Sequence, residues 1–178
     1  MKPITQKESE ALLIVFKDFS HYYNANSISK ILGISRVGAM KIFRKLLKEN
    51  IVESQKIGKS IIYKPKLNDY YACKLIAFLL VDEANNLKRW KEEFKELFKE
   101  GRIILLFGSA IKNYASAQDI DIMIIAEDKD KKEIDKILSE KQKLLPKKIH
   151  AINLTAKDLL DNIDNKNKAI MDIIKNAI

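Results

Sequence analysis

Two carboxylates spaced two residues apart are the first feature of this chain that can do chemistry. Asp119 and Asp121 open the apolar run 119–125, which reads DIDIMII. On a strand, residues i and i+2 project from the same face, so both side chains can reach one divalent metal ion. Mg²⁺ commonly binds one or two protein carboxylates together with substrate phosphates. The spacing therefore predicts a site for Mg²⁺, or Mn²⁺, and the structural alternative is an Asp-x-Asp that only ends a turn.

A glycine and a serine end the preceding apolar run. Residues 103–107, IILLF, lead directly into Gly108 and Ser109, and Lys112 follows shortly after. Gly108 lets the backbone approach a phosphate, Ser109 offers a hydroxyl and an N–H, and Lys112 can neutralise negative charge. A nucleoside triphosphate (NTP) held there would lie beside the metal, and positioning and electrostatics carry most of phosphoryl-type transfer. Gly-Ser after a strand is common by itself, but two such pairs on successive apolar runs are more specific.

The two pairs together carry a family resemblance. The segments 107–109 (FGS) and 119–122 (DIDI) resemble the signature of the DNA polymerase beta-type nucleotidyltransferases in their small, minimal form. The resemblance covers about residues 101–155, and it implies that the Gly-Ser pair holds the nucleotide's phosphates and that the two aspartates bind magnesium. Active members usually carry a third carboxylate on the following strand. Here the next apolar stretch, 148–154, contains no acid, and His150 stands at about that position, either as a metal ligand or proton acceptor or as an ordinary strand histidine.

Three strands and several helices are expected to position these groups. After the two apolar runs, the expected elements are a helix over about 131–143, a third strand over 149–154, and helices over about 155–162 and 168–178. Strand, loop, strand, helix, strand and then helices give an α+β domain with a small mixed sheet.

Composition and charge narrow the class of protein. With 47% hydrophobic and 32% charged residues in 178, the chain is of the core-forming kind. No apolar run reaches the roughly 18–20 residues of a membrane span, and the first residues are polar, so we expect a cytoplasmic protein without a membrane partner. Residues 1–68 hold 13 Lys/Arg against 5 Asp/Glu, net +8, whereas residues 69–178 hold 20 against 19, net +1. This asymmetry predicts that the first part binds a polyanion.

The first part has the pattern of a winged helix-turn-helix. The expected elements are a helix over 6–19, a short helix over 28–32 capped by Ser27, a turn at Gly33, a helix from the cap Ser35 to about Asn50, and strands over 51–56 and 60–64. A hairpin directly after a recognition helix is a wing. The segment 27–64 resembles the winged helix-turn-helix DNA-binding domains of bacterial and archaeal repressors.

One face of the longer helix is cationic. Its core stripe is expected at Ala39, Phe43, Leu46 and Asn50, which leaves another face for the major groove of double-stranded DNA, although a solvated Lys/Arg face is the alternative. The residues expected to contact DNA, those at the wing tip included, are Ser35, Arg36, Met40, Lys41, Arg44, Lys45, Lys48, Lys56 and Lys59.

Between the two domains we expect a helical connector. The boundaries are then 1–67 for the winged helix-turn-helix, 68–100 for the connector and 101–178 for the nucleotidyltransferase-like domain. The connector would comprise a strongly apolar helix over 69–87 and an amphipathic helix over 87–100, whose apolar stripe is Trp90, Phe94, Leu97 and Phe98. The first of these helices is apolar enough to need cover, and paired DNA half-sites would suit a homodimer.

Two functions remain open on these grounds. The first is a DNA-associated nucleotidyltransferase that transfers a nucleoside monophosphate from an NTP–Mg²⁺ complex to a hydroxyl of a protein, an RNA or a small molecule. The second is a transcriptional regulator whose nucleotidyltransferase fold no longer catalyses and instead senses a nucleotide or mediates assembly. The intact Gly-Ser and Asp-x-Asp pairs favour the first, and the missing third carboxylate favours the second. A third possibility is a winged helix that binds RNA or protein for the enzyme.

Overall fold

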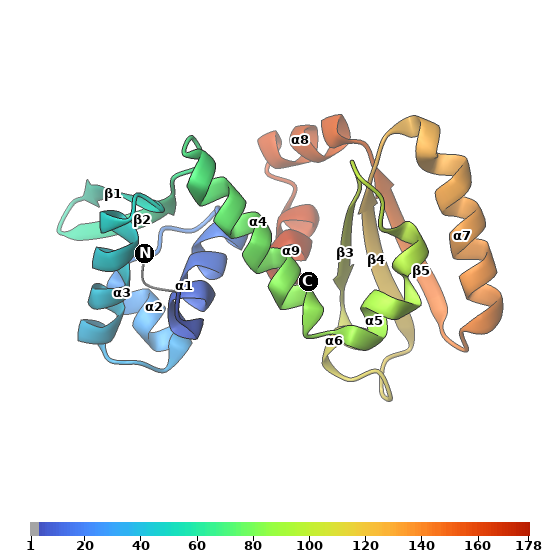
Figure 1. Ribbon diagram of the computed structural model, residues 1–178, viewed down its shortest axis with the longest axis horizontal. Coiled ribbons are helices and arrows are strands. Elements are labelled where there is room, and N and C mark those ends of the chain that lie inside the picture. The colour runs from blue at the N-terminus through green and yellow to red at the C-terminus, as the bar shows by residue number, and fades with distance from the viewer. Residues whose placement is uncertain (1–3) are drawn as a thin grey trace. The chain divides into compact units, whose positions relative to one another are not determined.

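The chain folds into two compact units. The computed structural model describes residues 4–178, and its contacts divide the chain into Met1–Glu83 and Ala84–Ile178 (Figure 1). Within the described range, every helix is too short or too polar to cross a membrane. The α+β class expected from the sequence is confirmed, with helices and a hairpin in the first unit and a mixed sheet in the second.

The first unit is a winged helix-turn-helix. It contains α1 (Gln6–Lys17), α2 (Ala25–Leu32), α3 (Arg36–Lys48), β1 (Val52–Ile57), β2 (Ser60–Pro65) and all but the last two residues of α4 (Tyr70–Asn85). The two strands form an antiparallel hairpin, the wing. Phe43 of α3 stacks on Tyr63 of β2 with 3.9 Å between ring centroids, so the wing is fixed to the helix that precedes it. Leu12, Ile28 and Leu46 fill the core beneath.

The caps of α2 and α3 set the angle of the helix-turn-helix. The expectation that Ser27 caps α2 is wrong, because Asn24 Oδ1 accepts the N–H groups of Asn26 and Ser27, both at 2.9 Å. Ser27 Oγ accepts the Asn24 N–H in return, which completes a capping box one turn earlier in the chain. Gly33 then takes the left-handed conformation, φ 61°, as expected. Ser35 caps α3 as predicted, since its Oγ accepts the Gly38 N–H at 3.0 Å.

The end of α3 differs from the expectation. Asn50 was expected on the core stripe, but it lies beyond the helix with φ 62° and is exposed. Its side-chain amide donates to Asp69 Oδ2 at 2.7 Å and accepts from Lys66 Nζ at 2.6 Å. Asn tolerates the left-handed conformation, so this residue turns the chain from α3 into the wing.

The second unit is built on a three-stranded sheet. Its elements are α5 (Lys88–Glu93), η1 (Lys95–Leu97), β3 (Ile103–Phe107), α6 (Ser109–Lys112), β4 (Asp119–Ile125), η2 (Asp128–Asp130), α7 (Lys131–Leu144), β5 (Lys148–Leu154), α8 (Ala156–Asp164) and α9 (Lys168–Asn176). β4 lies in the centre, antiparallel to β3 and parallel to β5, so the mixed sheet is confirmed. The free side of β3 is paired in part, because Leu106 and Ile178 exchange two backbone hydrogen bonds of 2.8 and 3.0 Å.

Helices cover both faces of this sheet (Figure 1). Ile120, Ile122 and Ile124 of β4 pack into a core with α5, η1, α6 and α7. Met123 and Ile125 point to the opposite face, where α8 and α9 pack. Asp119 and Asp121 have the same parity as Met123, so they belong to the α8–α9 face at the beginning of β4.

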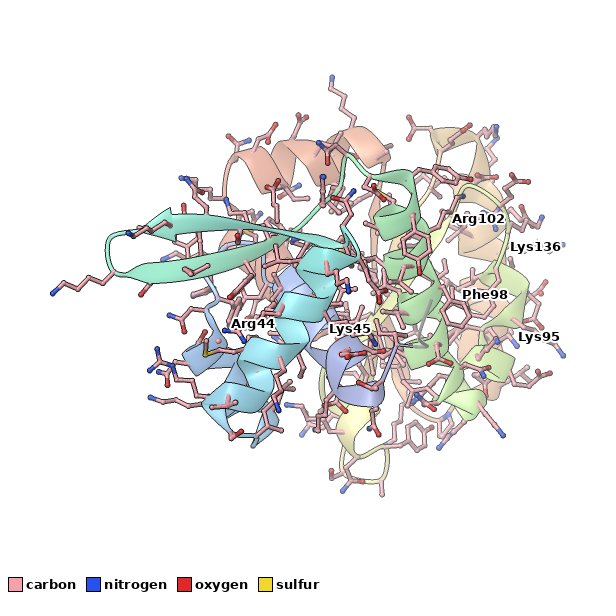
Figure 2. All side chains as sticks on the ribbon, turned by 60° about the vertical axis from the view of Figure 1, so that its left-hand side comes forward. Arg44, Lys45, Lys95, Phe98, Arg102 and Lys136 are labelled. Atoms are coloured by element: carbon pink, nitrogen blue, oxygen red, sulfur yellow. The ribbon has the colours of Figure 1, made fainter. Side chains whose placement is uncertain are left out.

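The segment 87–100 is not the single helix expected from its pattern. It breaks at Phe94 into α5 and the 3-10 turn η1, although Trp90, Phe94 and Leu97 are all buried as expected. Phe98, the fourth residue of the expected stripe, is 48% exposed (Figure 2). Residues 68–85 pack into the core of the first unit through α4, whereas 87–97 pack into that of the second.

A buried arginine joins the beginning of β3 to the beginning of α7. Arg102 (Figure 2) is fully buried in its side chain, and its Nη2 donates to Asp130 Oδ1 at 3.0 Å and to Glu133 Oε2 at 2.7 Å. Charge-assisted bonds of this kind fix the direction in which β3 enters the sheet. The register of β3 on β4, which pairs Phe107 with Asp121, then places Gly108 beside the beginning of β4.

Candidate functional site

The two aspartates lie at the beginning of the central strand. Asp119 and Asp121 are the first and third residues of β4, and their side chains are 32% and 24% exposed. The carboxylates therefore emerge on one face, beyond the part of that face that α8 and α9 cover. Two half-buried negative charges are open to solvent on one side and supported by the sheet on the other.

Gly108 brings the turn after β3 against Asp121. Phe107 of β3 pairs with Asp121 of β4, and Gly108 follows with φ 79° before α6 begins at Ser109. A Cβ on Gly108 would lie 2.2 Å from Asp121 Oδ2, which is closer than any side chain allows. The positive φ favours glycine, and any larger residue here would also require the Asp121 carboxylate to move. Ser109 and Lys112 are both exposed on the adjoining short helix.

The third strand adds a histidine to the carboxylates. β5 runs parallel to β4 in a register that places His150 opposite Asp121. His150 Nδ1 lies 3.2 Å from Asp119 Oδ2 and 3.7 Å from Asp121 Oδ1, and the imidazole is 47% exposed. The structure thus brings together all three residues that the sequence suggested as metal ligands, from two strands.

The carboxylates repel each other across this small space. Burial raises the pKa of the Asp121 carboxyl above its ordinary value, and the negative charge of Asp119 raises that pKa further. His150 acts in the opposite direction through its charge and a hydrogen bond, but it does not cancel the rise. A positive ion placed between the carboxylates would relieve the same repulsion.

The donor set fits a divalent ion. One ligand atom from each of Asp119, Asp121 and His150 lies within 4.8 Å of the others. Ligands bound at about 2.0–2.2 Å around one ion are about 3–4 Å apart, so only small side-chain movements would bring these atoms to a common ion. The exposure of the three groups leaves further coordination positions for water or for phosphate oxygens.

Aromatic and cationic side chains hold the loop between α6 and β4, a feature that sequence reasoning did not single out. The Arg89 guanidinium carbon lies 3.7 Å from the centroid of the Tyr114 ring, and Lys147 Nζ lies 4.8 Å from it. Trp90 meets the same ring edge-on at 5.4 Å between centroids. These partners come from distant parts of the chain, so no local pattern could have found them. They fix the loop that leads into Asp119.

The cationic residues of α3 and the wing form the second candidate site. Ala39, Phe43 and Leu46 are buried as expected. The expected DNA-contact residues that lie exposed, or half-buried in the case of Met40, are Ser35, Arg36, Met40, Lys41, Arg44, Lys48, Lys56 and Lys59. Lys56 lies near the end of β1, and Lys59 lies in the wing turn itself, next to Gly58 with φ 58°.

Two of the residues expected to contact DNA, Ser35 and Lys45, make hydrogen bonds within the first unit. Ser35 caps α3 with its hydroxyl. Lys45 lies on the side of α3 nearer α1, apart from Arg44 (Figure 2), and its Nζ donates to Glu8 Oε2 at 2.7 Å. Burial alone would raise the pKa of the Glu8 carboxyl, but hydrogen bonds from Lys45 and the Thr5 backbone outweigh burial and hold that pKa below its ordinary value.

Comparison with known proteins found one family model and several similar solved structures. Residues 90–175 match the family model described as "Polymerase beta, Nucleotidyltransferase". No curated protein matches the chain. Similar solved structures include the zinc-responsive MarR family member ZitR of Lactococcus lactis (15% identity, TM-score 0.41, 55% of this chain and 65% of that one) and the adhesin competence repressor AdcR of Streptococcus pyogenes (13%, 0.42, 55% and 70%). A ZitR mutant in complex with DNA is also similar (14%, 0.39, 52% and 63%). The chain thus spans less than two thirds of the length of these two ZitR structures. The residues that match the nucleotidyltransferase model lie in the second unit.

Proposed function

We propose that the nucleotidyltransferase domain of residues 90–175 transfers a nucleoside monophosphate from an NTP to a hydroxyl acceptor, and that the winged helix binds double-stranded DNA. In this reaction the acceptor hydroxyl gives up its proton to solvent and its oxygen forms a bond to the α-phosphorus. The bond from that phosphorus to the oxygen that bridges it to the β-phosphate breaks, and pyrophosphate leaves with that oxygen. The observation that carries the proposal is the convergence of Gly108, Asp119 and Asp121 on one position.

Each side chain has a role that its position supports. Asp119 and Asp121 would hold a divalent ion, Mg²⁺ or Mn²⁺, with His150 beside them. That ion, when bound, supplies positive charge that stabilises the attacking and leaving oxygens. The open backbone at Gly108 and the hydroxyl of Ser109 would bind the outer phosphates, and Lys112 would neutralise part of their charge. The acceptor hydroxyl, on a protein, an RNA or a small molecule, would reach the α-phosphate from the exposed side.

A label on the α-phosphate tests the transfer. The protein is incubated with α-³²P NTPs, Mg²⁺ or Mn²⁺, and candidate acceptors that include copurified protein and RNA, and pyrophosphate is measured in parallel. We expect labelled acceptor and one pyrophosphate per transfer, and we expect Asp119→Asn and Asp121→Asn to abolish both. Asp128→Asn, an exposed acid beyond β4, is the matched control and should leave both intact. Transfer that survives Asp119→Asn would overturn the assignment of the site.

One observation favours a second function. In the register of β4 and β5, His150 occupies the place opposite Asp121 at which a third carboxylate would be expected. A regulator that binds nucleotide without turning it over would retain Gly108, Asp119 and Asp121 and could lose the third acid. Nucleotide binding without pyrophosphate release, for every acceptor and ion tried, would support this function over the first.

The DNA-binding role rests on the exposed face of α3 and the wing. Arg36, Lys41 and Arg44 leave α3 away from its buried stripe, as a helix in the major groove requires. We expect Arg44→Ala to weaken binding to duplex DNA and to flatten its salt dependence. Binding that responds neither to salt nor to this substitution would exclude a groove-docked α3. The homodimer expected from paired half-sites remains a prediction, which the mass of the DNA complex tests.

A further inference from the structure

The metal-binding position proposed for this domain has an imidazole as its third donor. His150 enters from β5, in register with Asp121, and its Nδ1 faces both carboxylates at 3.2 and 3.7 Å. The remaining side of the group is open, because the three side chains are between 24% and 47% exposed. The protein therefore offers two oxygens and one nitrogen on one side of an ion and leaves the other side free.

Donor chemistry decides which ions such a set prefers. Mg²⁺ is a hard ion that takes oxygen ligands in near-ideal octahedral geometry. Imidazole suits Zn²⁺ and other first-row transition ions, whose affinity for nitrogen-containing sites rises along the Irving–Williams order. Exchanging a third carboxylate for a neutral imidazole also lowers the negative charge of the site from three to two, which weakens purely electrostatic binding of Mg²⁺. The preference of imidazole for transition-metal ions and the lower negative charge of the site both favour Zn²⁺ over Mg²⁺.

The size of the group sets the number of ions. The three ligand atoms all lie within 4.8 Å of one another, so they surround a single position. Two ions about 3.5–4 Å apart would need more donors than these three side chains provide. In the absence of nucleotide, the site should therefore take one ion.

We propose that Asp119, Asp121 and His150 form a single site for a divalent transition-metal ion, with Nδ1 of His150 as a ligand, and that this site selects Zn²⁺ over Mg²⁺. The inference rests on the proposed role of the β4 carboxylates as metal ligands. It adds that β5 sets the identity of the ion. A site built for oxygen ligands alone would not discriminate in this way.

Two measurements without nucleotide test the proposal. In calorimetric titrations, the wild-type protein should bind one Zn²⁺ per chain, at least about tenfold more tightly than Mg²⁺. His150→Asp should lower the ratio of Zn²⁺ to Mg²⁺ affinity about tenfold or more, and Asp119→Asn should lose both ions. His21→Gln is the matched control, because His21 is the other histidine of the chain and lies in the first unit.

The histidine ring reports coordination directly and does not depend on whether the His150→Asp variant folds. With ¹⁵N-labelled histidine in the His21→Gln variant, a single ring remains, and its Nδ1 resonance should shift on addition of one equivalent of Zn²⁺. An unshifted Nδ1 with Zn²⁺ bound, or equal affinities for Zn²⁺ and Mg²⁺, would overturn the proposal. Nucleotidyl transfer could still occur in that case, and transfer could equally fail while the ion preference holds, so the two outcomes are separable.

Discussion

Gly108 lies so close to Asp121, a proposed metal ligand, that a Cβ at this position would displace the carboxylate. A Cβ would lie 2.2 Å from Asp121 Oδ2, and φ is 79°. We therefore expect Gly108→Ala to displace Asp121 and abolish Zn²⁺ binding, while the backbone conformation adds a loss of about 1–2 kcal/mol in the free energy of unfolding. Calorimetric titration measures the first effect and urea unfolding the second.

Gly101 provides the control for this substitution. It has nearly the same conformation, φ 82°, but nothing lies within 4 Å of the position that its Cβ would take. Gly101→Ala should therefore show the backbone cost alone and bind Zn²⁺ as the wild type does. If both variants lost the ion equally, the contact with Asp121 would not be the cause.

Asp121 makes the metal-free protein sensitive to pH. Its pKa is raised, so the folded state holds the proton more tightly than the unfolded chain does. Stability therefore falls as pH rises from the ordinary value of 3.8 through the raised pKa, and the loss persists above that window. Asp121→Asn removes this cost, and we expect the melting temperature in EDTA at pH 7 to rise by about 1–3 °C. The gain should shrink as the pH approaches 4.

The substitution Asp128→Asn, at an exposed acid, is the control for Asp121→Asn. It should leave the melting temperature unchanged both at pH 7 and near pH 4. Added Zn²⁺ should reverse the order, because it stabilises the wild type and not Asp121→Asn. A melting temperature for Asp121→Asn that stays below the wild type at every pH would contradict electrostatic strain at this site.

We expect the two sides of α3 to serve different purposes, one contributing to stability and the other to the proposed DNA binding. Lys45 donates to the buried carboxylate of Glu8, whereas Lys41 is exposed. Lys45→Ala leaves Glu8 without its main partner and should cost about 1–3 kcal/mol of stability with little loss of DNA affinity. Lys41→Ala should leave stability unchanged, weaken DNA binding and reduce the slope of log K against log salt by about 1. Urea unfolding and fluorescence anisotropy at several salt concentrations measure the two effects.

The contribution of Glu8 also sets a pH dependence. Its pKa is lowered in the folded protein, so its stabilisation is present above the ordinary value of 4.5 and disappears as pH falls through the lowered pKa. The difference between wild type and Lys45→Ala should shrink accordingly below pH 4.5. If Lys45→Ala instead weakened DNA binding as much as Lys41→Ala, Lys45 would belong to the groove face as the sequence suggested.

Local patterns predicted most of the elements, because their signals lie in neighbouring residues. Ser35 as a cap, the alternation around the wing turn and the apolar runs of β3 and β4 were all recognised from sequence. The errors occurred where two local solutions compete. Asn24 and Ser27 can both cap a helix, and the amphipathic stripe of 87–97 fits a continuous helix as well as the bent path that the structure takes.

The candidate site was predictable in its residues but not in its contacts. Spacing identified Asp119 and Asp121, and the family resemblance suggested His150. The register of β5 on β4, the contact of Gly108 with Asp121 and the pairing of Lys45 with Glu8 all join residues far apart in sequence. No periodicity encodes such contacts, because tertiary packing decides them.

In the molecule as a whole, the two units differ in net charge. The first unit, residues 1–83, holds 14 Lys/Arg against 8 Asp/Glu, net +6, and the second, residues 84–178, holds 19 against 16, net +3. We therefore expect the long-range attraction to DNA to come mainly from the first unit. Six exposed cations, the residues Arg36, Lys41, Arg44, Lys48, Lys56 and Lys59, are available for the groove and its phosphates. If all six released a counterion, log K would fall with log salt with a slope of about −5.

The coupling between DNA and nucleotide distinguishes the two proposed functions. An effector that alters DNA affinity must itself bind more or less tightly to the DNA complex by the same factor, whatever the path between the units. For a transferase that is merely delivered to DNA, no such coupling is needed, and we expect saturating NTP with Mn²⁺ to change the DNA dissociation constant less than about twofold. A regulator requires a change of about fivefold or more. Anisotropy titrations of DNA with and without a non-hydrolysable NTP analogue measure this change in the DNA dissociation constant.

The variant Asp119→Asn is the control. It is expected not to hold the ion, so it shows whether any change in DNA affinity originates at the β4 carboxylates. A large change that Asp119→Asn removes would favour the regulator over the transferase, and it would show that His150, in place of a third carboxylate, belongs to a sensor.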